Sequence, residues 1–425
     1  MESRRTQKLA TFVLGCVAVT AIGAVEIDTA HAQNGSSAWP QWGGPNRDFK
    51  VPSVKIADKW PADGPKKVWT RELGDGYSGI VARDGVLYTM YRKGDDEVVV
   101  ALDADTGKTR WEYSYAAPSL KGQTVAHGKG PNSTPLLAGK QLVTVGFAAK
   151  MHGLDANTGK VLWSHDLIKE FGAKSLEYGY SASPMSYKDG ILVAVGGSQM
   201  GMACMNPATG AVVWKSEPFD VSYASPILVN VLGEDQCIIV GATQAIAISA
   251  ADGKPRLRFT NENQAKVSAF TPLWGTDNRL YVGSHTDGGS RMFKLSRDGD
   301  KTQAEELWFA RKTGFIHSSA VWMDDHIYGA AGVQPPTFMV AVDVKTGETK
   351  WKERGFPKAN CLYVDGKLIL LDEDGQLALA TATPEKFTVH SKVQLLKNPA
   401  RTAPTLVGPR LYVRDRKSIM ALDLS

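Results

Sequence analysis

One short pattern recurs along this 425-residue chain and constrains its fold more than any other feature. In its fullest form an apolar run ends at Asp103, Thr106-Gly107 follows, and a tryptophan stands at Trp111. Three further copies keep the spacing of eight residues between the Asp or Asn and the Trp, at Asp155 and Trp163, Asn206 and Trp214, and Asp343 and Trp351. Weaker copies at 252–253, 298–299, 380–381 and 421–423 bring the total to eight units, at a mean spacing of about 46 residues.

The residues of the pattern indicate a strand, a tight turn and a second strand. A carboxylate or amide such as that of Asp103 accepts backbone N–H groups in a turn, and Gly107 supplies the positive φ that a tight hairpin needs. A large flat indole at a fixed place in each unit suits packing between neighbouring sheets. We therefore expect structural docking roles for Asp103, Asp155, Asn206 and Asp343, and for Trp69, Trp111, Trp163, Trp214 and Trp351.

Two more strand signals precede each copy of the pattern. A short apolar strand follows a Ser/Thr-Pro step, as at Thr134-Pro135 and Ser183-Pro184, and a second strand follows a turn, as at 85–88. Four strands repeating every 40–50 residues are typical of a β-propeller. The sequence therefore predicts an all-β fold, an eight-bladed β-propeller with four-stranded antiparallel blades. A β-sandwich does not explain the fixed offsets.

The two ends of the chain predict how the ring closes. The chain stops at Ser425 before the eighth unit reaches its outer strand, and residues 67–73 resemble the outer-strand segment 160–167. We expect an N-terminal strand carrying Trp69 to close the last blade and remove an open sheet edge. The expected organisation is a signal peptide at 1–32, an N-terminal extension at 33–65 and the propeller at 66–425. Leu257 and Phe387 stand near the tryptophan position in blades 4 and 7, which predicts weaker joints there.

The first 32 residues have the features of a secretory signal peptide. Arg4, Arg5 and Lys8 precede an apolar stretch at 9–25, and Ala30-His31-Ala32 forms a small-residue cleavage site. The alternatives are a transmembrane anchor, for which the stretch is short, and a twin-arginine signal, which the residues after Arg5 match poorly. We expect Sec-type export, cleavage after Ala32, and a periplasmic or extracellular monomer with no transmembrane span. The net charge of +5, without a run of basic residues, argues against nucleic acid as a partner.

The recurring pattern resembles the tryptophan-docking motif of pyrroloquinoline-quinone (PQQ) propellers. Residues 39–48 also look like the mature N-terminus of secreted bacterial PQQ-like repeat proteins, so the likeness covers 39–425. That family includes PQQ-dependent alcohol and sugar dehydrogenases. It also includes non-enzymatic relatives, among them the propeller lipoprotein of the outer-membrane β-barrel assembly machinery. The resemblance is specific for fold and much less so for activity.

The dehydrogenases of this family carry parts that this sequence lacks. They hold an adjacent cysteine pair against the quinone and bind calcium through Glu, Asn and Asp. Here the predicted mature chain has only the isolated Cys204, Cys237 and Cys361, expected as core residues, and no compact acidic cluster maps onto the calcium ligands. We therefore expect no cofactor and no metal site, with PQQ and calcium as the alternative.

The loops that lead into the innermost strands should line the mouth of the propeller axis. The candidate binding residues in these loops are Asn132, Tyr180, Tyr223, His317 and Arg401. Together with nearby lysines they form a polar, basic ring that suits a small anion, such as the carboxylates of PQQ. Solvated loop residues with no ligand are the alternative interpretation. His317 is the most catalyst-like residue by type, although a single loop histidine more often only forms hydrogen bonds.

Three functions therefore remain open. The first is a non-enzymatic, secreted binding or scaffold propeller of the cell envelope, whose axial face meets an envelope protein or a small anionic ligand. The alternative is a PQQ-dependent dehydrogenase that oxidises alcohols or sugars at an atypical axial site. A third is another enzyme built on the same face.

Overall fold

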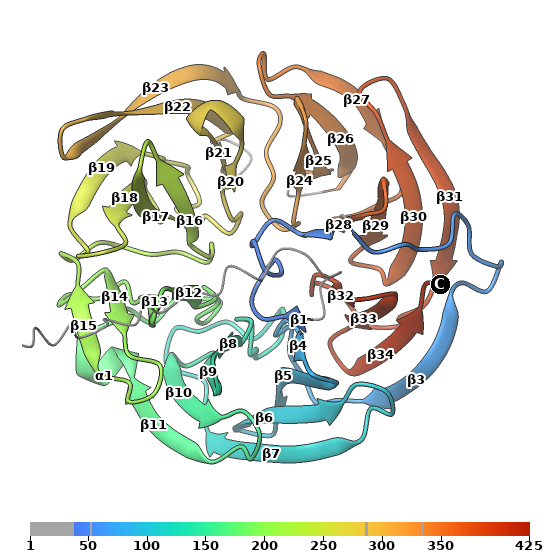
Figure 1. The fold of residues 1–425 in the computed structure, drawn as a ribbon, viewed down its shortest axis with the longest axis horizontal. Helices are drawn as coiled ribbons and strands as arrows, with labels where there is room; N and C mark the ends of the chain where they lie inside the picture. The colour runs from blue at the N-terminus through green and yellow to red at the C-terminus, as the bar shows by residue number, and fades with distance from the viewer. Residues whose placement is uncertain (1–37, 52, 285–287, 333–334) are drawn as a thin grey trace, which may run out of the picture. The chain divides into compact units, whose positions relative to one another are not determined.

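Eight antiparallel sheets stand around a common axis in the computed structural model (Figure 1). The structure describes residues 38–51, 53–284, 288–332 and 335–425, so the predicted signal peptide lies outside the described residues. The predicted eight-bladed, all-β propeller is confirmed. Within the described residues the one α-helix is α1 (Leu167–Phe171). No helix in that part of the chain is long and apolar enough to span a bilayer.

The first four blades follow one another along the chain, each with its first strand nearest the axis. Blade 1 contains β4 (Val81–Arg83), β5 (Val86–Lys93), β6 (Asp96–Asp103) and β7 (Thr109–Ala116). Blade 2 contains β8 (Leu136–Ala138), β9 (Gln141–Val145), β10 (Lys150–Asp155) and β11 (Val161–Asp166). Blade 3 contains β12 (Met185–Tyr187), β13 (Gly190–Ala194), β14 (Met202–Met205) and β15 (Val212–Lys215). Blade 4 contains β16 (Ile227–Val231), β17 (Glu234–Val240), β18 (Gln244–Ser249) and β19 (Pro255–Thr260).

The remaining blades complete the ring. Blade 5 contains β20 (Leu273–Trp274), β21 (Arg279–Gly283), β22 (Ser290–Asp298) and β23 (Lys301–Ala310). Blade 6 contains β24 (Val321–Met323), β25 (His326–Ala331), β26 (Phe338–Asp343) and β27 (Thr349–Glu353). Blade 7 contains β28 (Asn360–Val364), β29 (Lys367–Leu371), β30 (Gln376–Ala382) and β31 (Phe387–Gln394). Blade 8 contains β32 (Thr405–Val407), β33 (Arg410–Arg414), β34 (Ser418–Asp423) and the N-terminal β3 (Lys66–Glu72).

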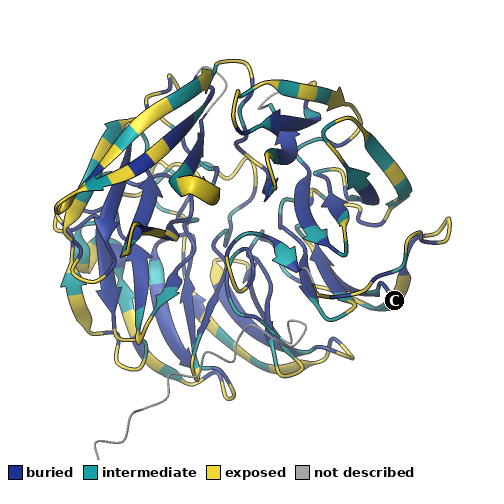
Figure 2. Ribbon diagram, turned by 45° about the horizontal axis from the view of Figure 1, so that its top comes forward, coloured by how far each residue is buried: buried dark blue, intermediate teal, exposed yellow. Residues whose placement is uncertain are grey.

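The core lies between the blades and is built from the middle strands of each sheet. Strands such as β5 and β30 are almost wholly buried, because both faces of their sheet meet a neighbouring blade. Outer strands such as β7 alternate between exposed and partly buried residues (Figure 2). Cys204, Cys237 and Cys361 are all buried free thiols within this core, as expected from their isolation in the sequence. The outer strands therefore show the alternation, with a period of two, that is expected of a strand with one buried and one exposed side.

Closure of the ring by an N-terminal strand is confirmed. β3 pairs antiparallel with β34, and Trp69 stands opposite Ala421. A second element locks the same joint, because the fully buried Arg414 of blade 8 donates hydrogen bonds to blade 1. Its acceptors there are the Gly76, Ser78 and Met90 carbonyls and the Thr89 hydroxyl, at 2.8–3.1 Å.

Residues 38–51 and 53–60 form what we call the N-terminal strap, whose first part lies at the centre of the ring and whose second part runs outward over blade 7 (Figure 1). β1 (Ala38–Trp39) adds a fifth strand to blade 1 on the axial side of β4, and β2 (Lys50–Val51) pairs parallel with β28 of blade 7. Between them Trp42 Nε1 donates to Thr271 Oγ1 of blade 5 at 3.2 Å. The strap therefore crosses the axis, which the sequence did not predict.

Tryptophans dock neighbouring blades by a common geometry. The rings of Trp69, Trp111, Trp163 and Trp214 lie against the glycine of the next blade's turn, so that a Cβ on Gly107 would come within 2.6 Å of the Trp69 ring. The indole N–H donates to a carbonyl of that blade, in the pairs Trp69 to Ala104, Trp111 to Ala156, Trp163 to Pro207 and Trp351 to Thr383, at 2.8–3.0 Å. Trp163 is buried, whereas Trp69, Trp111, Trp214 and Trp351 are half-buried, which is less than the sequence suggested. The Asp and Asn residues of the pattern accept turn N–H groups, in the pairs Asp103 with Thr106, Asp155 with Thr158, Asn206 with Thr209 and Asp343 with Thr346.

Two joints differ from the sequence expectation. In blade 5, Trp308 docks on Gly347 and donates to the Val344 carbonyl at 2.9 Å, although its spacing does not fit the pattern. In blade 7, Phe387 is not at the docking register, because the residue opposite Leu379 next to the bulge is Ser391. The strap covers this position, since Trp60 N donates to Ser391 Oγ at 2.8 Å and the Trp60 side chain is buried. Leu257 stands opposite Ala247 at the equivalent place in blade 4.

Candidate functional site

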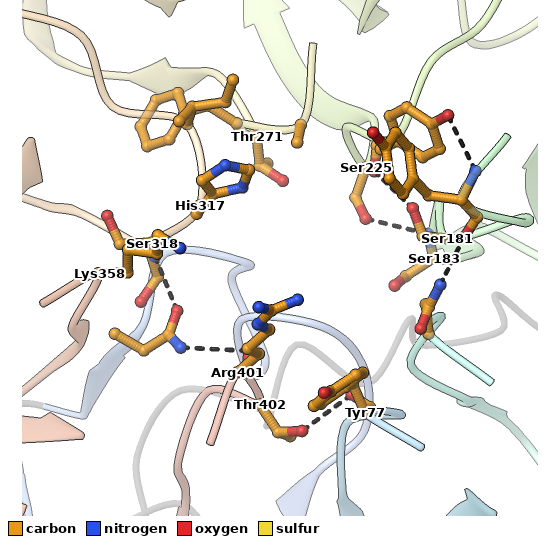
Figure 3. Close-up of a pocket in the computed structure, with 18 of the residues that line it drawn as sticks. Tyr77, Ser181, Ser183, Ser225, Thr271, His317, Ser318, Lys358, Arg401 and Thr402 are labelled. Atoms are coloured by element: carbon orange, nitrogen blue, oxygen red, sulfur yellow. Dashed lines mark hydrogen bonds between the residues drawn. The ribbon is translucent and has the colours of Figure 1, made fainter. Parts of the chain in front are cut away.

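A cavity of about 610 Å³ lies on the propeller axis. All eight blades and the strap contribute to its lining. The residues from the loops before the innermost strands include Tyr77, Asn132, Tyr178, Ser181, Tyr223, Phe270, His317, Asn360, Arg401 and Thr402. Figure 3 shows the labelled side chains standing around one open space. The volume is that of a site for a small organic molecule.

Hydroxyl groups that join neighbouring blades form much of the wall. Ser183 Oγ accepts the Thr134 N–H at 3.0 Å, and Ser225 Oγ accepts the Ser183 N–H at 2.9 Å. These are the Ser/Thr-Pro steps of the repeat, so the local sequence that starts each inner strand also stitches it to the next blade. Among the described residues neither hydroxyl donates a hydrogen bond, so each can donate its proton to a ligand in the cavity.

Charged residues pair with one another along another part of the cavity. Arg401 Nε and Nη2 contact Glu373 Oε1 at 2.8 and 2.7 Å, and Lys358 Nζ contacts Glu373 Oε2 at 2.9 Å. Burial disfavours ionisation of Glu373, but the two cations outweigh it and hold its pKa below the ordinary value. The Arg401 guanidinium also lies over the Tyr77 ring, 5.5 Å from its centre. This cluster therefore carries much less net positive charge than its lysine and arginine suggest.

An aromatic group occupies a different sector of the wall. The Tyr178 and His127 rings are stacked with centres 6.0 Å apart, and Tyr178 meets Tyr223 edge to face at 5.6 Å. Asn132 Nδ2 donates to the Tyr178 carbonyl at 2.9 Å, which fixes this loop. Burial raises the pKa of Tyr223, so its hydroxyl is neutral at physiological pH.

The strap supplies one boundary of the cavity, through Trp42, Arg47 and Phe49. Trp42 and Phe49 meet edge to face with ring centres 5.0 Å apart. Because β1 and β2 pair on the axial side of blades 1 and 7, the strap lies across the channel. We call these three residues the cavity floor.

The structure brings together four of the five candidate binding residues, namely Asn132, Tyr223, His317 and Arg401. Tyr180 does not line the cavity. It is buried, and its hydroxyl donates to the Ala194 carbonyl of blade 3 at 2.6 Å, because the chain turns inward two residues after the exposed Tyr178. Whether the four bind a cofactor stays a prediction.

Sequence reasoning missed the cavity floor, Tyr178 and Glu373. The floor residues lie in the Trp39–Asp48 segment and just after it, and that segment had been noticed only for its likeness to other N-termini. Glu373 follows β29 and had no distinguishing spacing. Its proximity to Arg401, 28 residues later, comes from the fold of blade 7.

The residues present do not match a calcium-bound quinone site. Calcium needs 6–8 oxygen ligands, usually with several carboxylates. Among the described residues that line the cavity Glu177 is the one carboxylate, and the adjacent Glu373 is held by Lys358 and Arg401. Nor do the described residues hold any group of three His, Cys, Asp or Glu side chains placed for a metal ion. The described cysteines are separate, so none forms the adjacent pair of the dehydrogenases.

Comparison with known proteins gives relatives of two kinds. The chain is 23% identical over 325 residues to outer membrane protein assembly factor BamB of Yersinia pestis, which covers 73% of this chain and 79% of that protein. It is also 23% identical over 219 residues to quinohemoprotein alcohol dehydrogenase ADH IIB of Pseudomonas putida, but this match covers 50% of the chain and 30% of the dehydrogenase. The chain therefore spans under a third of that dehydrogenase.

This chain shares its fold with solved structures of both kinds of relative. BamB from Moraxella catarrhalis aligns with a TM-score of 0.57 and 18% identity over 84% of this chain and 99% of that one. A europium-containing methanol dehydrogenase aligns with a TM-score of 0.69 and 13% identity over 92% and 99%. At these identities the likeness establishes the propeller and confirms the resemblance to PQQ-type repeats. The family described as outer membrane protein assembly factor BamB matches residues 59–232 and 202–354, and this chain belongs to that family.

Proposed function

We propose that this protein is a non-enzymatic binding propeller of the bacterial cell envelope, whose axial mouth and surrounding loops meet an envelope protein. The proposal includes Sec-type export with cleavage after Ala32 and action as a monomer. The observation that carries it is the chemistry of the cavity. Arg401 and Lys358 are already paired with Glu373, and the lining offers one carboxylate where a calcium-dependent quinone needs several.

The family supports the same choice. The Yersinia relative is matched over most of its length and is named for outer membrane protein assembly, whereas the dehydrogenases are matched over a minor part of theirs. Assembly of outer membrane proteins is therefore the process in which we place this chain.

A PQQ-dependent dehydrogenase is the second candidate, favoured by a polar axial cavity of suitable size and by the fold of the methanol dehydrogenase. Calorimetry of the purified protein with PQQ and Ca²⁺ separates the two. We expect no uptake at micromolar PQQ and no dye-linked oxidation of alcohols or sugars. Stoichiometric PQQ binding that weakens tenfold or more in Arg401→Ala, since a charge-assisted hydrogen bond contributes about 1.5–3 kcal/mol, would establish the dehydrogenase.

Site-specific photocrosslinking in cells tests the binding role directly. A photoreactive residue at Tyr178, which is 37% exposed at the cavity, should crosslink to a component of the outer-membrane assembly machinery. Leu232 is the matched control, because it is exposed but follows the end of β16, whereas the cavity residue Ser225 precedes the start of that strand. Equal crosslinking from both positions, or from neither, would contradict the proposal.

A further inference from the structure

Three arginines are buried among the residues that the structure describes, and they differ in how their charge is balanced. Arg92 Nη2 lies 3.2 Å from the Glu97 carboxylate. Arg414 donates five hydrogen bonds, and the nearby Asp415 and Asp75 offset part of the effect of burial, which still lowers its pKa to about 10. Both therefore have acidic groups that offset the cost of burying a cation.

Arg47 has no carboxylate partner among the described residues, and the nearby Cys237 thiol, whose pKa burial raises to about 12, is neutral at physiological pH. Its hydrogen bonds run from Nη1 to Gln41 Oε1 at 3.3 Å and the Pro184 carbonyl at 3.2 Å, and from Nη2 to the Ser183 carbonyl at 3.5 Å. All three are at the long end of the range for N–H···O bonds, and the buried Nε has no acceptor. Burial lowers the pKa of Arg47 to about 10. The guanidinium still carries its charge at neutral pH, so a buried cation remains without a counter-ion.

Arg47 lies where a ligand in the cavity could supply the missing negative charge. Its side chain is only 8% exposed, and it is one of the three residues of the cavity floor. The hydroxyls of Ser183 and Ser225 stand in the same wall with protons to donate. Trp42 and Phe49 supply an apolar surface beside it. An anion that reached the floor would therefore meet a cation, hydroxyl donors and an apolar contact together.

We propose that the cavity floor binds the carboxylate of a small organic acid, with Arg47 as its counter-ion. One unpaired cation balances one negative charge. A phosphate dianion would leave an excess charge in a buried site, and the neighbouring Arg401 and Lys358 are already paired with Glu373. The inference shares the cavity with the proposed function but does not depend on the identity of the envelope partner.

Calorimetry with benzoate and its neutral analogue benzamide tests the charge requirement on the mature chain. We expect one benzoate site with a dissociation constant below about 1 mM, at least tenfold weaker binding of benzamide, and no displacement by phosphate. Arg47→Gln should weaken benzoate binding at least tenfold. Arg110→Gln is the matched control, because it removes one exposed arginine that pairs with Asp103 away from the cavity, and it should leave binding unchanged.

A second measurement needs no variant and therefore holds even if Arg47→Gln folds poorly. In wild-type protein labelled with ¹⁵N-arginine, benzoate should shift the guanidinium resonance of Arg47 and leave unchanged that of the fully buried Arg414, which does not line the cavity. Equal binding of benzamide and benzoate, unchanged affinity in folded Arg47→Gln, or an unmoved Arg47 resonance at saturating benzoate would overturn the inference. These measurements do not involve crosslinking from Tyr178, so the carboxylate site and the proposed function are tested independently.

Discussion

Replacing Trp69 by alanine isolates the joint at which the two ends of the propeller meet. Trp69 reaches from β3 of blade 8 onto blade 1, where its ring lies against Gly107 and its Nε1 donates to the Ala104 carbonyl at 2.9 Å. The substitution removes this contact but leaves the backbone pairing of β3 with β34 in place. The result therefore measures side-chain docking across the closure.

The structure sets the size of the effect. A tryptophan that is half-buried removes about 100 Å² of apolar surface from water, worth about 2.5 kcal/mol. Loss of the indole hydrogen bond adds about 1 kcal/mol. Partial relaxation of the neighbours reduces the total to about 3 kcal/mol. With an unfolding entropy of about 2.1 cal/mol/K per residue over the folded unit 35–425, this corresponds to a fall in Tm of about 4 °C.

Thermal unfolding followed by circular dichroism, with hydrogen exchange read by mass spectrometry, is the assay. Trp111→Ala is the control, because Trp111 makes the same contact with Gly159 and Ala156 at a joint where the chain is continuous. Both variants should lose similar stability, but only Trp69→Ala should speed exchange in β3 and β34. A Tm within about 1 °C of the wild type, or faster exchange confined to blades far from the closure, would refute the reasoning.

Two further substitutions test other parts of the ring. Trp60→Ala should lower the free energy of unfolding by about 3 kcal/mol, because Trp60 is 4% exposed and covers a joint that has Ser391 at the docking register. Hydrogen exchange in β31 should then accelerate, and unchanged exchange there would contradict a docking role for Trp60. Asp372 is buried, and burial raises its pKa to about 6, so its contribution to stability is complete below about pH 4 and is lost as the pH rises through 6. Asp372→Asn should therefore raise the free energy of unfolding by about 2 kcal/mol at pH 8 and change it little at pH 4, as measured by urea unfolding at each pH.

The repeat made the architecture predictable from the sequence. The fixed spacing of Asp103 and Trp111 encodes a turn and a docking contact, and both are local properties of a few residues. The likeness of residues 67–73 to an outer strand was enough to predict the pairing of β3 with β34. Trp308 was missed because the hairpin of β22 and β23 is longer than in other blades, which moves the tryptophan away from the expected offset.

The cavity was predictable in position but not in chemistry. The loops before the innermost strands must meet at the axis of any propeller, so Asn132, Tyr223, His317 and Arg401 were found. Their electrostatics depends on partners that have no fixed spacing, as with Glu373 and Arg401. The strap has no counterpart in the repeat, and its role could not be predicted without its partners, which lie in seven different blades.

The strap also imposes an order on how this chain can mature. Its residues precede the blades in the sequence, yet Trp60 hydrogen-bonds to Ser391, 331 positions later, and Lys50 to the Trp322 carbonyl, 272 positions away. Contacts of such long sequence separation form late, since the entropy of closing the intervening chain must be lost before they contribute. Lys50 and Trp60 therefore cannot form these contacts until blades 6 and 7 are present. The strap can pair with blade 1 early through β1, but its contacts with blades 6 and 7 and the pairing of β3 with β34 need strands that come much later in the chain.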